Sequence, residues 1–209
     1  LEGLRDKFDA LFIKESSGLL PDPWAARDAY VSVVLDRSEE NIARFLSEHA
    51  PAVKDPRARV RTLTLLELQR HSLMMFTSCG WFFDQLSRIE PVQVLLYAAR
   101  ALELARTFGA DYESEFVVAL KDDEGVWEKL VKTQIVTPDH VAAHYAVSLL
   151  FEDQPPSFVH HHRADSERFT RRVEGGVTVA AGRAAFFDGC TGAGWTRTFF
   201  SAVLKGQRV

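Results

Sequence analysis

The residues best suited to chemistry lie in one short segment, Thr77 to Asp84, which reads TSCGWFFD. It places the large rings of Trp81, Phe82 and Phe83 next to small residues, a hydroxyl group and a carboxylate. An aromatic ring beside such polar groups suits a polyol ligand, because a sugar offers an apolar face for stacking and hydroxyl edges for hydrogen bonds. A carbohydrate-binding surface is therefore one interpretation of this segment.

The alternative is that the three rings are core residues at a corner between two helices, and composition alone favours this reading. Asp84 would then be a helix cap or one half of a surface ion pair. Gly80 bears on both interpretations, because it is expected to end the preceding helix and to deliver Trp81 at a helix end. Cys79 is interpreted as a small buried hydrophobe, since no base beside it is evident that would make it a nucleophile.

Histidines are the other candidates. His71 precedes the aromatic segment and is expected to pair with a core carboxylate, although it could also face the same cleft. His140 and His144 have the spacing that lets two imidazoles face one metal ion, but no third ligand accompanies them, so we interpret them as structural. The tract His160 to His162 is interpreted as a polar surface turn that binds metal adventitiously. We therefore predict neither a metal site nor a cofactor.

The composition excludes several classes of protein. The chain has 209 residues, a formal net charge of -4, 46% hydrophobic and 26% charged residues, all ordinary for a globular protein. The charge argues against nucleic-acid binding, and no apolar run is long enough for a membrane span. Two cysteines without metal spacing fit a reducing compartment, so we expect a cytoplasmic protein.

Apolar spacing predicts helices over most of the chain. Helix starts are expected where a capping residue precedes a proline suited to the first helical position, at Asp22–Pro23 and Thr137–Pro138, and at Ser38, where Glu39 and Glu40 favour the helix dipole. Trp24, Val31, Val34 and Leu35 are expected to form one buried face. The run from Arg57 to Phe76 is apolar on nearly every side and is expected to be the central helix.

The residue pattern changes after Pro155 and Pro156, where β-prone runs alternate with glycine-rich turns. The expected strands are Phe169 to Val173, Val177 to Ala181, Ala184 to Phe187 and Thr196 to Val203. We therefore predict a mainly α fold, with a helical bundle domain over 1–154 and a small antiparallel β region over 155–209. The first residue, Leu1, and the alternating pattern at the end suggest a piece cut from a longer protein, with a truncated β region.

Beyond these patterns, the run LLELQRHSLMMFTSCGWFFDQLSRIEPVQVLLYAARALELA from Leu65 to Ala105 resembles the helical region C-terminal to the barrel of glycoside hydrolase family 57 proteins. It is most similar to the subgroup whose C-terminal part is domain of unknown function 3536. The resemblance extends to DPWAARDAYVSVVLDRS, WEKLVKTQIV and HVAAHYAVSLLF, and it becomes thin past Pro155. It implies a parent protein that hydrolyses or transfers α-glucan chains with two barrel carboxylates.

No barrel can be read in this sequence, so no catalytic residue is assigned to the chain, and the chain alone is expected to be inactive. The resemblance implies instead a domain that packs on the N-terminal catalytic barrel of the same polypeptide and lines its α-glucan cleft. In related transferases a Ser-Ser-Asp-Trp-like motif approaches the barrel mouth; it would match Ser78 to Trp81, with departures at Cys79 and Gly80. The implied substrate-binding residues are Trp81, Ser78, Asp84 and Phe82. The alternative is a purely structural or interaction module without ligand contact.

Overall fold

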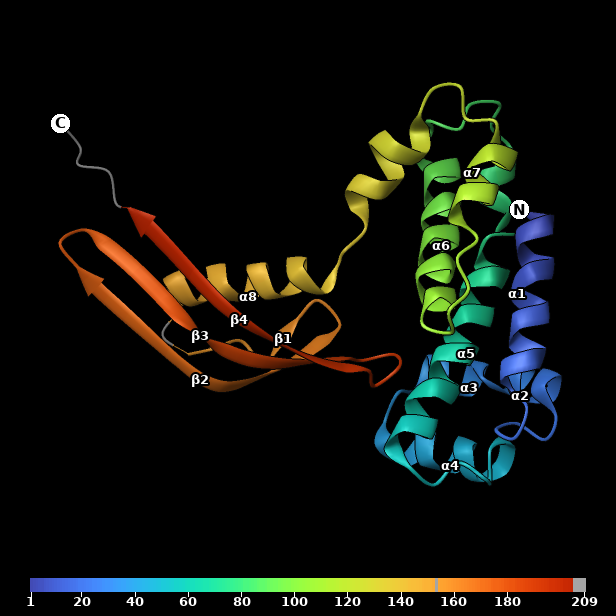
Figure 1. Cartoon of the computed structure of the whole chain (residues 1–209), viewed down its shortest axis with the longest axis horizontal. Helices are drawn as coiled ribbons and strands as arrows, with labels where there is room; N and C mark the ends of the chain where they lie inside the picture. Colours follow the sequence, from blue (N-terminus) through green and yellow to red (C-terminus); the bar gives the residue numbers. More distant parts are fainter. Residues whose placement is uncertain (153, 205–209) are drawn as a thin grey trace. The chain divides into compact units, whose positions relative to one another are not determined.

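The computed structural model describes residues 1–152 and 154–204 (Figure 1). They divide into two compact units, Leu1–Ile135 and a second that begins at Val136. The first unit is helical, and the second combines one helix with a four-stranded antiparallel sheet. The predicted fold class, mainly α with a small antiparallel β region, is confirmed. Along the chain the boundary between the units falls between Ile135 and Val136. The sequence analysis placed it after residue 154. The difference arises because the last helix packs with the strands that follow it.

Capping residues start the helices of the first unit. The carboxylate of Asp22 accepts a hydrogen bond from the backbone N–H of Ala25, and Ser38 caps the helix that follows it, as predicted. Asp55 accepts hydrogen bonds from two backbone N–H groups ahead of the longest helix. The helices are α1 (Glu2–Glu15), α2 (Pro23–Ala29), α3 (Val31–Leu35), α4 (Glu39–His49), α5 (Pro56–Met74), α6 (Ile89–Arg106) and α7 (Glu113–Leu120), with shorter turns η1 (Ser78–Trp81), η2 (Trp127–Val131) and η3 (Lys132–Gln134).

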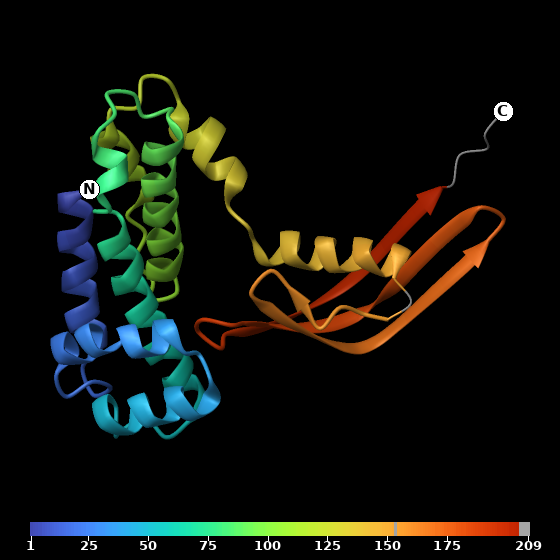
Figure 2. The same ribbon diagram turned by 180° about the vertical axis from the view of Figure 1, so that it is seen from behind.

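Helix α5 is the centre of the first unit, as its apolar composition predicted. It lies beside α1 and α6 in both views (Figures 1 and 2). One apolar cluster joins α1, α6, α7 and η2, around the fully buried Trp127, to Leu68 of α5 and to Met75 just after it. A second joins α2, α3 and α4 to the N-terminal half of α5. Burying each large apolar side chain stabilises the fold by about 1.5–3 kcal/mol. The two clusters together therefore hold both halves of α5 in place.

The sequence predicted a buried face after Asp22, but the residues that form this face differ from those predicted. Tyr30 separates α2 from α3, and the residues that turn inward are Ala26, Tyr30 and Val33. Leu35 is 82% exposed and Val31 58% exposed. The reason is that Tyr30 is drawn into the core by its hydrogen bond to a buried carboxylate on α5, described below, and this sets which side of the chain faces inward.

In the second unit, α8 (Pro138–Phe151) begins at Thr137, where the predicted cap is confirmed as a reciprocal capping box with His140. The strands are β1 (Phe158–Val159), β2 (His162–Glu174), β3 (Val177–Asp188) and β4 (Gly194–Leu204), in the order β1-β2-β3-β4. The two strands predicted over Val177 to Ala181 and Ala184 to Phe187 form a single strand, β3, because the chain continues as a strand through Gly182. A Cβ atom there would lie 2.3 Å from the carbonyl oxygen of Arg168, so only glycine fits.

Helix α8 covers one face of the sheet, as seen from behind in Figure 2. Alternate residues of β3 point to that face and are buried, which is the period of a half-buried strand: Thr178, Ala180, Ala184, Phe186 and Asp188. Tyr145 of α8 packs edge-on against Phe186 and Phe199, with ring centroids 5.4 and 5.6 Å away. The buried face ends at Asp188, where the chain turns toward β4.

Candidate functional site

The segment from Thr77 to Asp84 lies between α5 and α6 on the surface of the first unit. Helix α5 ends at Met74, so the prediction that Gly80 ends it is wrong. Gly80 instead lies inside the 3₁₀ turn η1, which packs against α6. A Cβ atom on Gly80 would lie 2.4 Å from Cγ2 of Val94 on α6. Glycine is therefore required here for the close approach between η1 and α6. This contact sets the position of Trp81, the last residue of η1.

Trp81 is both exposed and anchored. Its side chain stacks on Phe76, with ring centroids 5.9 Å apart and the planes 18° from parallel. Phe76 in turn packs against the main core cluster, and the guanidinium of Arg5 lies 5.5 Å from its ring centre. Trp81 nevertheless remains 56% exposed. One side of the indole is thus supported by the fold while much of its surface is open to a ligand or to another protein surface.

The neighbouring residues of the segment are exposed as well. Phe82 is 81% exposed and Phe83 43% exposed, and Ser78, Cys79 and Asp84 also lie at the surface. The alternative of a buried helix corner is contradicted for these rings, and so is the expectation that Cys79 is buried. Three large exposed aromatic side chains in one short segment are uncommon on a protein that has no use for them. We call Trp81, Phe82 and Phe83 the aromatic segment from here on.

A buried polar cluster on α5 lies before this segment in the chain. Glu67 is 1% exposed; its Oε1 accepts hydrogen bonds from the hydroxyl of Tyr30 at 2.8 Å and from Arg37 at 2.7 Å, and its Oε2 from Arg70 at 3.1 Å. Burial raises the pKa of Glu67, but these hydrogen bonds and charges outweigh it and hold the pKa below its usual value. His71 Nδ1 lies 2.9 Å from the backbone carbonyl oxygen of Glu67 and 3.8 Å from its Oε2, so the hydrogen bond of the imidazole is to the backbone, and the expected carboxylate partner is only a neighbour.

The Glu67 cluster is structural rather than a site for ligands. Tyr30, Arg37 and Arg70 all donate to the carboxylate, and the cluster ties the chain around Tyr30 to the central helix. Burial also lowers the pKa of His71, which fits an imidazole held inside the fold. The histidine is therefore held between the backbone of Glu67 and the ring of Tyr97.

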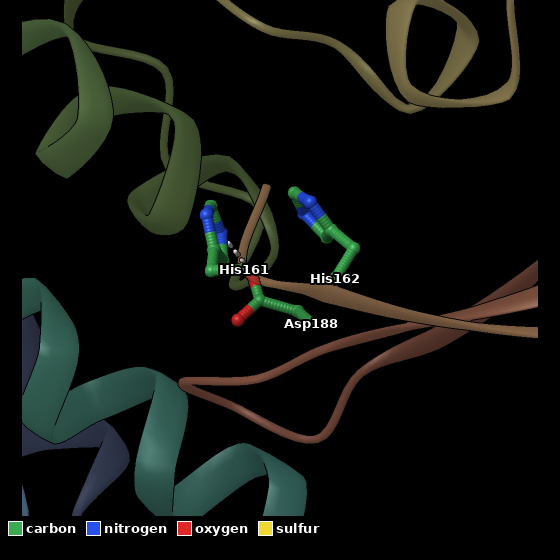
Figure 3. Close-up of side chains that lie close together, drawn as sticks. All are labelled: His161, His162 and Asp188. Carbon is green, nitrogen blue, oxygen red and sulfur yellow. Dashed lines mark ion pairs between the residues drawn. The ribbon is translucent and has the colours of Figure 1, made fainter. Parts of the chain in front are cut away.

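The second unit brings together a set of residues that sequence reasoning missed. His161, His162 and Asp188 each offer one ligand atom, and these atoms all lie within 4.8 Å of one another (Figure 3). The predicted polar surface turn is wrong for His162, which is 6% exposed at the start of β2. The missing signal was strand register, since His162 pairs directly with Asp188 across β2 and β3.

The other predicted histidine pair lies elsewhere in this unit. The Nδ1 of His140 accepts a hydrogen bond from the backbone N–H of Thr137 in the capping box, and the ring of His144 packs edge-on against His160. Neither belongs to a potential metal cluster among the residues that the structure describes. Their interpretation as structural residues agrees with these contacts.

A model of the family "Domain of unknown function (DUF3536)" matches residues 1–209, so the chain belongs to this family. Neither curated proteins nor solved structures give a significant match. Within the described part of the chain, no helix combines the length and apolar character required to cross a membrane.

Proposed function

We propose that this domain is a non-catalytic part of a family 57-like glycoside hydrolase or glucanotransferase, and that its aromatic segment lines the carbohydrate cleft of the parent protein. The observation that carries the proposal is Trp81, which is anchored on Phe76 and yet more than half exposed. A ring held in this way loses little conformational freedom when a ligand stacks on it, which favours binding.

The polar residues around Trp81 support a sugar ligand in particular. The hydroxyl of Ser78 and the carboxylate of Asp84 belong to the same exposed segment. The hydroxyl can donate to and accept from sugar hydroxyls, and the carboxylate can accept from them. The apolar face of a pyranose would stack on the indole. The chain supplies no pair of carboxylates for glycoside hydrolysis in this proposal; those belong to the N-terminal barrel of the same polypeptide.

A second candidate function is a purely structural contact with the barrel, and Phe82 favours it. At 81% exposure this side chain leaves most of its apolar surface in water, which costs free energy unless another surface covers it. The two functions are compatible if Phe82 docks on the barrel and Trp81 faces the cleft. They differ in which substitution affects ligand binding and which affects assembly.

The test uses the full polypeptide that contains this domain, with Trp81→Ala and Phe82→Ala as the variants. Leu35→Ala is the matched control, because Leu35 is an equally exposed apolar residue on α3. We expect Trp81→Ala to weaken malto-oligosaccharide binding about tenfold, from a lost stacking contribution of about 1.4 kcal/mol, and to lower the melting temperature only slightly, through the lost contact with Phe76. If Trp81→Ala lowers the melting temperature and leaves binding intact, the structural function replaces the ligand-binding one.

A further inference from the structure

Two turns of the second unit are locked together at one end of the sheet. The turn His160–His161 joins β1 to β2, and the turn after Asp188 joins β3 to β4. The backbone N–H of Gly189 donates to the carbonyl oxygen of His161 at 3.1 Å, and a Cβ atom on Gly189 would lie 2.5 Å from that oxygen. His160 adopts φ 54°, a left-handed conformation that is uncommon for residues other than glycine. The backbone around His161 is therefore tightly constrained.

The carboxylate of Asp188 is oriented by the same turn. Its Oδ1 accepts hydrogen bonds from the backbone N–H groups of Cys190 at 2.7 Å and Thr191 at 3.1 Å. Its Oδ2 lies 4.0 Å from Nε2 of His161. Figure 3 shows the carboxylate close to the two imidazole rings. Asp188 thus has one oxygen hydrogen-bonded to the backbone and the other near His161, and ligating carboxylates are commonly oriented by such hydrogen bonds.

The two imidazoles are positioned by packing. Their ring centroids are 4.0 Å apart, and the ring of His162 packs edge-on against Trp195 of β4 at 5.1 Å. His162 and Asp188 are buried, whereas the side chain of His161 is 54% exposed. The cluster therefore has a closed side within the sheet and an open side toward solvent.

We propose that His161, His162 and Asp188 form a binding site for a divalent first-row transition metal, with Zn²⁺ as the probe of choice. Two imidazole nitrogens and one carboxylate oxygen are ligands that such ions take. Ligand atoms bound at about 2.1 Å in a tetrahedral site lie roughly 3.4 Å apart. The three ligand atoms lie within 4.8 Å of one another, so metal binding requires them to approach, and His161, whose side chain is 54% exposed, is the residue with room to move. The exposed side leaves the fourth position to water or to an added ligand.

This inference is independent of the carbohydrate proposal, because its residues all belong to the second unit. The test is titration of the metal-free 209-residue chain with Zn²⁺ by calorimetry, together with the visible spectrum of the Co²⁺ form. We expect one ion per chain and the absorption of a four-coordinate site. Failure to bind stoichiometrically would overturn the proposal without affecting the role of Trp81.

The decisive variants are Asp188→Asn and His161→Ala, with His160→Asn as the matched control. Asparagine at 188 retains Oδ1 for the turn but replaces Oδ2 with an amide nitrogen, so the fold is kept while one ligand is lost; circular dichroism verifies this. Asparagine at 160 tolerates the left-handed backbone there. We expect each ligand variant to weaken Zn²⁺ binding at least about 100-fold, and the control to bind as the wild type does.

An adventitious histidine tract would behave differently. His160→Asn would then weaken binding as much as His161→Ala, and Asp188→Asn would have no effect. Either result contradicts the proposed site.

Discussion

Replacing Gly80 with alanine tests how the aromatic segment is held. The added Cβ atom would lie 2.4 Å from Cγ2 of Val94 and 3.3 Å from the carbonyl oxygen of Glu90. Val94 is 5% exposed and, being β-branched, has few alternative rotamers. Since it cannot move aside easily, η1 must shift from α6. Overpacking of this kind costs about 1–3 kcal/mol, and we expect Gly80→Ala to lower the free energy of unfolding by about 2 kcal/mol.

The measurement is urea unfolding followed by circular dichroism, together with a double-mutant cycle. Val94→Ala removes the clashing methyl group, at a cost of its own from lost burial of about 1.6 kcal/mol for two methyl groups. In the double variant the alanine at 80 fits, so we expect it to be more stable than the sum of the single effects by about 1–2 kcal/mol. A Gly80→Ala variant within about 0.5 kcal/mol of the wild type would refute the reasoning, because η1 would then not be pressed against α6.

Three further perturbations probe the scaffold. Glu67→Ala leaves Tyr30 and Arg37 without their shared acceptor, so we expect urea unfolding to show a loss of about 3–5 kcal/mol, whereas a loss under about 1 kcal/mol would contradict the structural role of the cluster. Although burial raises the pKa of Glu113, hydrogen bonds from Trp127 and nearby cations hold the pKa at about 2, below the usual 4.5. The unfolding free energy should therefore fall from about pH 5 toward pH 2, by at most about 3 kcal/mol, and Glu113→Gln should flatten this dependence. If the unfolding free energy of the variant depends on pH as steeply as that of the wild type, Glu113 is not the group responsible. Gly182→Ala places a Cβ atom 2.3 Å from a backbone oxygen that cannot move aside, so we expect a melting temperature several degrees lower, and an unchanged value would show that the strands separate freely there.

The elements of this fold that follow from local chemistry could be predicted from the sequence. Capping residues followed by proline or acidic residues located the starts of α2, α4 and α8, and an all-round apolar pattern identified α5 as central. The capping signals lie within the first turn of the helix that they start, and the apolar pattern lies within α5 itself.

Features that depend on contacts between elements could not be predicted. The aromatic segment reads as core because its residues are apolar, and only the packing of η1 on α6 leaves it exposed. The role of Gly80 depends on Val94 of another helix. The cluster of His162 and Asp188 depends on the register of β2 and β3, which also includes an irregularity between Ser166 and Arg168.

The most direct test of the central claim is the structure of the full polypeptide with a bound malto-oligosaccharide. The proposed function predicts a pyranose ring stacked on the exposed indole of Trp81, at an ordinary van der Waals distance of about 4 Å, with Ser78 or Asp84 within hydrogen-bond reach. A sugar bound only at positions remote from Trp81, with the aromatic segment covered by protein, would contradict it and leave the domain a structural role.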